Sequence, residues 1–189
     1  METIPQQTIK GLYRIVLYGP ESTGKTSLAQ ALAAHFKTQW VPEFARVYLQ
    51  EKWEREHVVC TLADLPKIVH GLMLWENKRL RLANKWLFCD TNALVTQVWS
   101  QTHYDGYCAP EIKKAVHDYH YDFYLLTQPD LPWVKDDLRD RPAAREEMFE
   151  AFKYQLDKHN LPFALVGGKQ AFRLQNAITA LKKWEESLI

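Results

Sequence analysis

The chain has 189 residues, of which 47% are hydrophobic and 25% are charged, and its formal net charge is +1. This length is sufficient for one domain whose core needs neither disulfides nor a structural metal. A net charge so close to zero argues against a dedicated nucleic-acid-binding protein, which usually carries a strongly basic face.

The N-terminal residues and the length of the apolar runs indicate the cellular compartment. Residues 1–10 lack the apolar core of a signal peptide, and no stretch reaches the 18 apolar residues of a membrane span. We therefore expect a cytoplasmic protein that makes no membrane contact. Cys60, Cys89 and Cys108 are odd in number and widely spaced, which favours buried thiols over metal ligands.

Apolar runs of strand length alternate along the chain with longer segments of helical periodicity. We predict strands over residues 12–18, 38–41, 86–90, 123–127 and 163–168. We predict helices over residues 25–37, from 42 to at least 49, 65–84, 92–101, 111–119, 143–158 and 170–188. This order predicts an α/β fold with three layers, in which helices cover both faces of a five-stranded, mainly parallel sheet. Residues 1–10 are assigned to a short N-terminal extension and residues 11–189 to a single domain.

The segment from Gly19 to Thr26 follows the first strand and leads into the first helix. It fits the pattern G-x-x-x-x-G-K-[ST], the phosphate-binding loop of nucleoside-triphosphate enzymes, and it lies between a strand and a helix as that loop requires. Lys25 is expected to reach the β and γ phosphates of ATP, and the Thr26 hydroxyl to ligate Mg²⁺. A glycine-containing turn with an incidental lysine is the alternative. The predicted ATP-binding residues of this segment are Gly19, Glu21, Ser22, Thr23, Gly24, Lys25, Thr26 and Ser27.

Two carboxylates follow the ends of other predicted strands. In parallel sheets, ligands bind beyond the carboxyl ends of the strands, so these residues are expected near the phosphate loop. Asp90 is predicted to hold Mg²⁺ or to act as a base, and Glu43 to take a proton from an acceptor hydroxyl or to hold ribose hydroxyls. The alternatives are that Asp90 caps a helix and that Glu43 is a first-turn glutamate favoured by the helix dipole.

Residues 129–145 form a charged segment that we interpret as a lid over the triphosphate. Arg139, Arg141 and Arg145 are expected to stabilise charge on the transferring phosphoryl group, with Arg141 also contacting ATP. A solvated charged loop would explain the same composition. Trp99 and Trp133 lie near predicted strand ends and are candidates for stacking on a base, although aromatic residues at such positions are more often part of the core.

Several motifs together resemble the ribosylnicotinamide kinase domain of NadR-like proteins, within the P-loop kinase superfamily. They are the phosphate loop, W-V-P-E-F-A-R at 40–46, F-C-D-T-N at 88–92, Y-D-F-Y-L-L at 121–126, and P-D-L-P-W-V at 129–134 followed by Asp136 and Arg139. Asn92 stands where that family commonly has a second aspartate, and Asp137 where it commonly has glycine.

This resemblance implies a kinase that uses ATP and Mg²⁺ to phosphorylate the 5′-hydroxyl of nicotinamide riboside, giving nicotinamide mononucleotide. The substrate-binding residues that we assign are Glu43, Arg46, Asn92, Trp99, Trp133 and Asp136. The expected partners are thus ATP and a small nucleoside, with no nucleic acid, and a homo-oligomer is compatible with the sequence. A kinase for another nucleoside or nucleotide, or an ATP-dependent regulatory switch, would carry the same phosphate loop.

Overall fold

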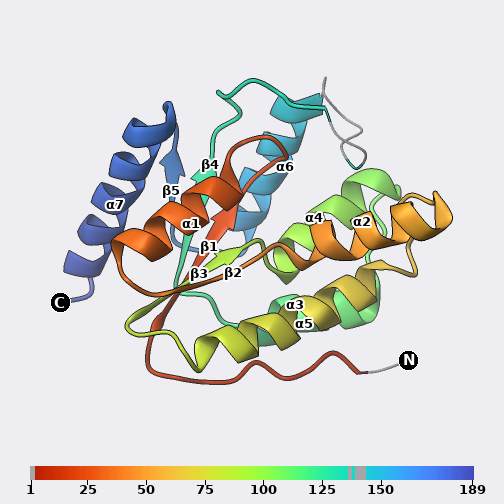
Figure 1. Ribbon diagram of the computed structural model, residues 1–189, viewed down its shortest axis with the longest axis horizontal. Helices are drawn as coiled ribbons and strands as arrows, with labels where there is room; N and C mark the ends of the chain where they lie inside the picture. The colour runs from red at the N-terminus through yellow and green to blue at the C-terminus, as the bar shows by residue number, and fades with distance from the viewer. Residues whose placement is uncertain (1–2, 136–137, 139–143) are drawn as a thin grey trace.

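The computed structural model describes residues 3–135, 138 and 144–189 (Figure 1). Its five strands form one parallel sheet in the order β2-β3-β1-β4-β5. The strands are β1 (Tyr13–Tyr18), β2 (Gln39–Val41), β3 (Trp86–Asp90), β4 (Phe123–Thr127) and β5 (Phe163–Val166). The helices are α1 (Lys25–His35), α2 (Phe44–Glu56), α3 (Leu65–Leu80), α4 (Ala93–His103), α5 (Pro110–Asp118), α6 (Arg145–Lys158) and α7 (Gln170–Glu186). The predicted three-layer α/β fold is confirmed.

The central strand β1 separates two helical layers. Ile15 and Leu17 point toward α1 and α7, whereas Val16 and Tyr18 point toward α3, α4 and α6. All four side chains are fully buried, because successive side chains of a strand point to opposite faces of the sheet and helices cover both faces here. In Figure 1, α1 and α7 lie on the left, and α2, α3, α4 and α5 gather on the right, where α3, α4 and α5 enclose a third apolar cluster. The carboxyl ends of β1 and β3 lie side by side, because Leu17 pairs with Asp90.

Several predicted boundaries differ from those in the structure. The helix predicted over 65–84 ends at Leu80, and Leu82, which continued the apolar pattern, is 68% exposed. Asn84 lies between α3 and β3. Its side-chain amide donates hydrogen bonds to the backbone carbonyls of Phe36 and Lys37, which lie between α1 and β2. The helix predicted from residue 42 begins two residues later and extends to Glu56.

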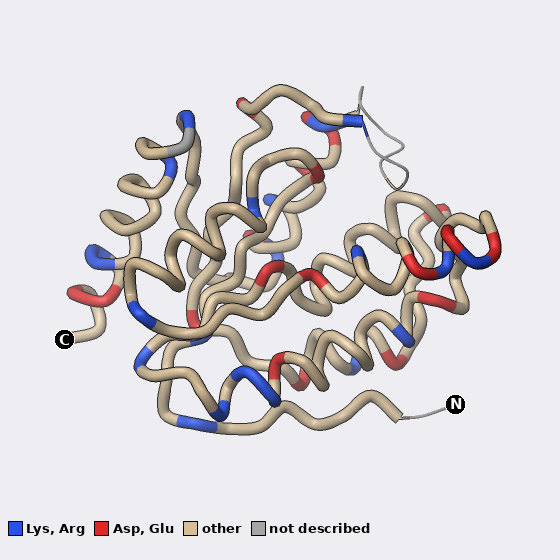
Figure 2. The backbone as a smooth tube through the Cα atoms, in the orientation of Figure 1, with Lys and Arg blue, Asp and Glu red and all other residues tan. Residues whose placement is uncertain are grey.

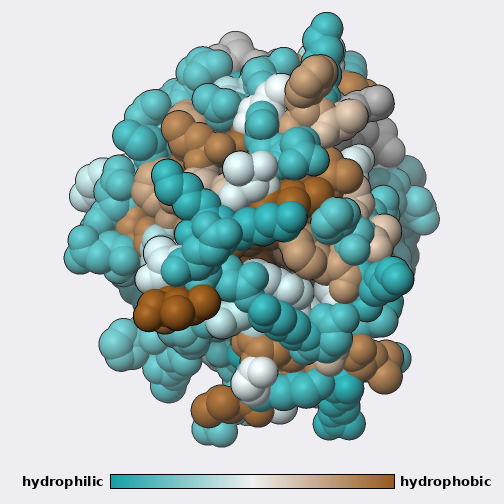
Figure 3. Space-filling view, turned by 90° about the vertical axis from the view of Figure 1, so that its left-hand side faces the viewer, coloured by the Kyte–Doolittle hydropathy of each residue, from teal (hydrophilic) through white to brown (hydrophobic). Residues whose placement is uncertain are grey.

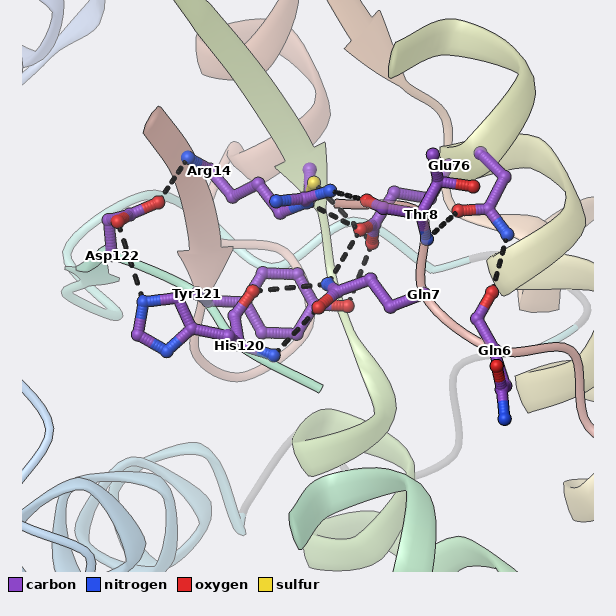
Figure 4. Close-up of polar contacts among 10 residues, drawn as sticks. Gln6, Gln7, Thr8, Arg14, Glu76, His120, Tyr121 and Asp122 are labelled. Atoms are coloured by element: carbon purple, nitrogen blue, oxygen red, sulfur yellow. Dashed lines mark hydrogen bonds and ion pairs between the residues drawn. The ribbon is translucent and has the colours of Figure 1, made fainter. Parts of the chain in front are cut away.

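The N-terminal segment is fastened to the sheet through a buried carboxylate, that of Glu76 on α3 (Figure 4). Gln7 Nε2, Arg14 Nε and Tyr121 Oη donate hydrogen bonds to this carboxylate over 2.9, 3.1 and 2.8 Å. Burial raises the pKa of Glu76, while hydrogen bonds from Gln7 and Tyr121 and the charge of Arg14 oppose that shift. The cluster thus joins residues preceding β1 to α3 and to the approach to β4.

Charged residues of both signs are distributed over the helices and loops, whereas the sheet is mostly uncharged (Figure 2). The side that carries α7 shows small hydrophobic patches separated by hydrophilic atoms (Figure 3). Within the described ranges, none of the helices is both long and apolar enough to cross a membrane.

Candidate active site

The phosphate loop joins β1 to α1 and has the backbone that its glycines allow. Gly19 has φ 132° and Gly24 has φ 77°, values that side-chain-bearing residues rarely adopt. A Cβ atom on Gly19 would lie 2.9 Å from the carbonyl oxygen of Thr127, so the loop also needs the absence of a side chain there. The Lys25 ammonium donates a hydrogen bond to the carbonyl oxygen of Pro20 over 2.7 Å and lines the cavity beside the loop.

Thr23 supports the loop from within. Its hydroxyl donates to the carbonyl of Pro20 over 2.8 Å and lies 2.6 Å from the hydroxyl of Thr127, which itself contacts the carbonyl of Tyr18. Because the side chain is fully buried, Thr23 would contact a nucleotide through its backbone rather than through its hydroxyl. The hydroxyl instead ties the loop to the end of β4.

Asp90 ends β3 and lies directly beside the phosphate loop. Thr26 Oγ1 donates a 2.5 Å hydrogen bond to Asp90 Oδ2, whereas Asp90 Oδ1 is buried and has no hydrogen-bond partner among the described residues. Burial raises the pKa of Asp90 to about 7, the charge of Glu43 adds to this shift, and Lys25 opposes it. A buried oxygen with no hydrogen-bond partner beside a hydroxyl fits a small, hard cation, so Thr26 and Asp90 are suited to hold Mg²⁺.

A cavity of about 500 Å³ opens from the phosphate loop and runs between α2, α4 and α6. Its polar end carries Lys25, Thr26, Glu43 and Arg46. The rest of its wall is mainly apolar or aromatic and includes Leu49, Val59, Cys60, Leu65, Ile68, Val95, Trp99, Tyr104, Met148 and Phe152. The cavity thus offers a phosphate-binding end, a carboxylate and an apolar compartment within one space, as a site for two substrates would need.

The aromatic wall is built mainly from the end of α4. Trp99 stacks on His103 with ring centroids 3.9 Å apart and an interplanar angle of 14°. Tyr104 meets the Trp99 ring edge-on at 5.9 Å, and its hydroxyl donates a 3.1 Å hydrogen bond to the carbonyl of Cys60. The prediction placed Trp99 near a ligand, and the geometry puts it in the cavity wall.

Two other residues predicted to bind substrate lie elsewhere. The side-chain oxygen of Asn92, Oδ1, accepts a hydrogen bond from the Val95 backbone amide and so caps α4. The side-chain amide nitrogen, Nδ2, donates a hydrogen bond to the Tyr124 hydroxyl. Asn92 is 2% exposed and does not line the cavity, so this arrangement does not bring it to the substrate side, and its contact with substrate stays a prediction. Helix capping, which we considered as an alternative role for Asp90, is thus performed by Asn92. Trp133 donates a 2.8 Å hydrogen bond to Glu21 Oε1, on the phosphate loop rather than in the cavity wall.

The predicted lid is described in part. Arg145 lines the cavity and donates hydrogen bonds to the carbonyls of Leu131 and Ser22 over 2.9 and 3.3 Å. The Val134 amide donates to Ser22 Oγ over 3.3 Å, so both ends of the segment contact the phosphate loop. The predictions for Asp136, Arg139 and Arg141 lie outside the described residues. Ser27, predicted to bind ATP, lines the cavity.

Sequence reasoning missed parts of the cavity that come from distant segments. Val59 and Cys60 belong to the connection between α2 and α3, and Met148 and Phe152 come from α6. Nothing in their local patterns distinguishes them from ordinary apolar residues. Thr91 was also missed, although it lines the cavity with φ 74°, an outlying backbone conformation for a β-branched residue.

Comparison with known proteins finds a matching family model and a related curated protein. The family model described as an AAA domain matches residues 14–172. The trifunctional NAD biosynthesis/regulator protein NadR of Escherichia coli (strain K12) is 29% identical over 168 residues, which cover 87% of this chain and 41% of that protein. The chain therefore spans about two fifths of the length of this curated relative.

Two solved structures share the fold. A crystal structure of NadR in complex with NR has a TM-score of 0.76 at 22% identity, covering 92% of this chain and 52% of that one. Thymidylate kinase from Ehrlichia chaffeensis has a TM-score of 0.63 at 14% identity, covering 91% of this chain and all of that one. At these identities the likeness shows a common fold.

Proposed function

The chain belongs to the AAA-domain family, and from this premise we propose that it is an ATP-dependent kinase for nicotinamide riboside. The reaction would transfer the γ-phosphate of ATP to the 5′-hydroxyl of the nucleoside and yield nicotinamide mononucleotide and ADP. The observation that carries the proposal is the single cavity in which the phosphate loop, Glu43 and an aromatic compartment meet. A motor or switch needs the first of these features but not the other two.

The donor side of this site would hold MgATP. The amides of the phosphate loop and the start of α1 suit the triphosphate charge, and Lys25 would contact the β and γ phosphates. Thr26 and Asp90 would hold Mg²⁺, which neutralises charge on the phosphates when bound. Arg145, at the base of the predicted lid, adds a cation on the same side.

On the acceptor side, Glu43, which lines the cavity, would accept the proton of the attacking hydroxyl. The 5′-oxygen would form a bond to the γ-phosphorus as the bond between that phosphorus and the ADP oxygen breaks, and the hydroxyl proton would pass to the carboxylate. The Glu43 side chain makes no capping hydrogen bond to α2, which leaves the carboxylate available for this role. Arg46, three residues after Glu43 and in the first turn of α2, also lines the polar end of the cavity.

The aromatic compartment suits the charge of the proposed substrate. The pyridinium ring of nicotinamide riboside is a flat cation, and aromatic faces attract such cations. Trp99 and Tyr104, which line this compartment, would provide aromatic surface to the ring, and Glu43 would add a negative charge nearer the phosphate loop. The likeness to NadR, one structure of which contains NR, supports this choice among nucleosides.

One observation favours a second candidate. Arg46 would suit an acceptor that already carries a phosphate, and thymidylate kinase shares the fold. A nucleotide kinase is therefore the main alternative. For either acceptor we place the reaction in the cytoplasm, since the three cysteines are free thiols and such thiols persist in a reducing compartment.

An acceptor panel tests the proposal. ADP release would be followed with ATP and Mg²⁺ alone, and after addition of nicotinamide riboside, uridine, thymidine or thymidine monophosphate. We expect nicotinamide riboside to raise the rate by about tenfold or more, and Lys25→Ala to abolish this stimulation. If only thymidine monophosphate raised the rate of ADP release, the acceptor would be a nucleotide and not nicotinamide riboside. If none of the acceptors changed this rate, the proposal that the protein is a kinase would be wrong.

A further inference from the structure

A glycine in the middle of α3 lies against the beginning of α2. Gly71 is buried in α3, and glycine inside a helix is destabilising relative to alanine, so its presence there calls for a packing reason. A Cβ atom at this position would lie 2.1 Å from Cζ and 2.2 Å from Cε1 of Phe44. The missing side chain therefore provides the space that the Phe44 ring occupies.

Two neighbouring aromatic rings restrict how the Phe44 ring could shift to avoid an added methyl group. Trp75, one turn along α3 from Gly71, meets it edge-on with ring centroids 5.0 Å apart and an interplanar angle of 87°. Tyr48, one turn along α2, stacks near it at 6.1 Å and 26°. Tyr48 is itself held by a 2.8 Å hydrogen bond from its hydroxyl to Asp64 Oδ1. A displacement of the ring would therefore move the first turn of α2.

The first turn of α2 carries the acceptor side of the site. Phe44 is the first residue of the helix, Glu43 is its N-cap, and Glu43 and Arg46 both line the cavity. Because no side-chain hydrogen bond fixes the Glu43 carboxylate at the cap, its location depends on where the helix begins. We propose that Gly71 is a positioning residue, which sets the location of Glu43 by admitting the Phe44 ring against α3. This inference rests on the acceptor-side role of Glu43 proposed above.

The test is a set of variants measured for kcat and KM with nicotinamide riboside and for ATP-analogue binding. Gly71→Ala should lower kcat/KM for the nucleoside roughly tenfold or more, because small misplacements of a reacting group are costly, while ATP-analogue affinity stays at the wild-type value. Alanine would by itself stabilise a helix, so a loss of activity cannot come from helix propensity. Gly11→Ala is the matched control, since a Cβ there meets no atom within 4 Å.

A second substitution separates positioning from a general loss of folding. Phe44→Leu shortens the side chain that the methyl group would strike, so Gly71→Ala with Phe44→Leu should recover most of the activity lost in the single variant. If the single variant does not fold, the double variant should fold and regain activity. Wild-type kcat/KM in Gly71→Ala, or no recovery in the double variant, would overturn the inference. A wild-type protein that does not phosphorylate nicotinamide riboside would instead overturn the proposed function.

Discussion

At the scale of single residues, Asp90 is a strongly perturbed group of the site. Its Oδ2 accepts a hydrogen bond from Thr26, but its buried Oδ1 has no hydrogen-bond partner in the described part of the chain. Burial, followed by the charge of Glu43, raises its pKa to about 7. A carboxyl group that is costly to ionise in the free protein gains from a cation, and this couples Mg²⁺ binding to release of its proton.

This perturbation predicts a pH-dependent stability in the absence of metal and nucleotide. The native protein keeps the Asp90 proton up to a pH of about 7, whereas the unfolded chain releases it near the ordinary value of 3.8. The unfolded state therefore binds fewer protons between these values, and the unfolding free energy should fall as pH rises through that window. Asp90→Asn should remove this part of the slope in urea denaturation. Parallel curves for the two proteins between pH 5 and about 7 would contradict the assignment.

At the scale of elements, the connection between α2 and α3 is held by one carboxylate. Asp64, 3% exposed, accepts hydrogen bonds from Lys52 Nζ at 2.5 Å, the Thr61 amide at 2.8 Å and the Tyr48 hydroxyl at 2.8 Å. Burial alone would raise the pKa of Asp64, but the hydrogen bonds from Lys52 and Thr61 lower it below its usual range. The connection supplies Val59 and Cys60 to the cavity wall, so Asp64 supports the aromatic compartment indirectly.

Asp64→Asn should therefore destabilise the protein and loosen its acceptor compartment. Breaking a buried ion pair leaves the Lys52 charge without its counterion, at a cost of about 3 kcal/mol in unfolding free energy. Lys67→Gln is the control, because its ammonium lies 4.0 Å from the same carboxylate and its side chain is 62% exposed. That control should cost less than about 0.5 kcal/mol in the same denaturation experiment. Equal losses in the two variants would show that Asp64 has no special role.

At the scale of the whole molecule, the fold and the donor half of the site follow from local patterns. Apolar runs ending in polar residues predict the strands, and the spacing from Gly19 to Thr26 predicts the loop that joins β1 and α1. The acceptor half depends on contacts between distant segments, such as those that bring α6 and the connection after α2 to one cavity. Single-sequence patterns also do not separate a cap from a ligand, which is why Asn92, predicted to contact substrate, is found as the N-cap of α4.

At the scale of the whole molecule, the extent of the cavity distinguishes an enzyme from a switch. A switch would hydrolyse ATP slowly and pass its state to a partner, and it would not need an apolar cavity beyond the phosphate loop. Here the cavity continues from the loop past Glu43 and Arg46 to the aromatic end of α4. This continuity is the whole-molecule feature that favours transfer of phosphate to a second substrate.

The most direct test measures both products of the proposed reaction. The protein would be incubated with ATP, Mg²⁺ and nicotinamide riboside, and ADP and nicotinamide mononucleotide would be quantified by chromatography for the wild type and Glu43→Gln. We predict one nicotinamide mononucleotide for each ADP in the wild type, and a loss of both in Glu43→Gln while ATP binding is retained. ADP formed without nicotinamide mononucleotide, or unchanged formation of both products in Glu43→Gln, would contradict the account.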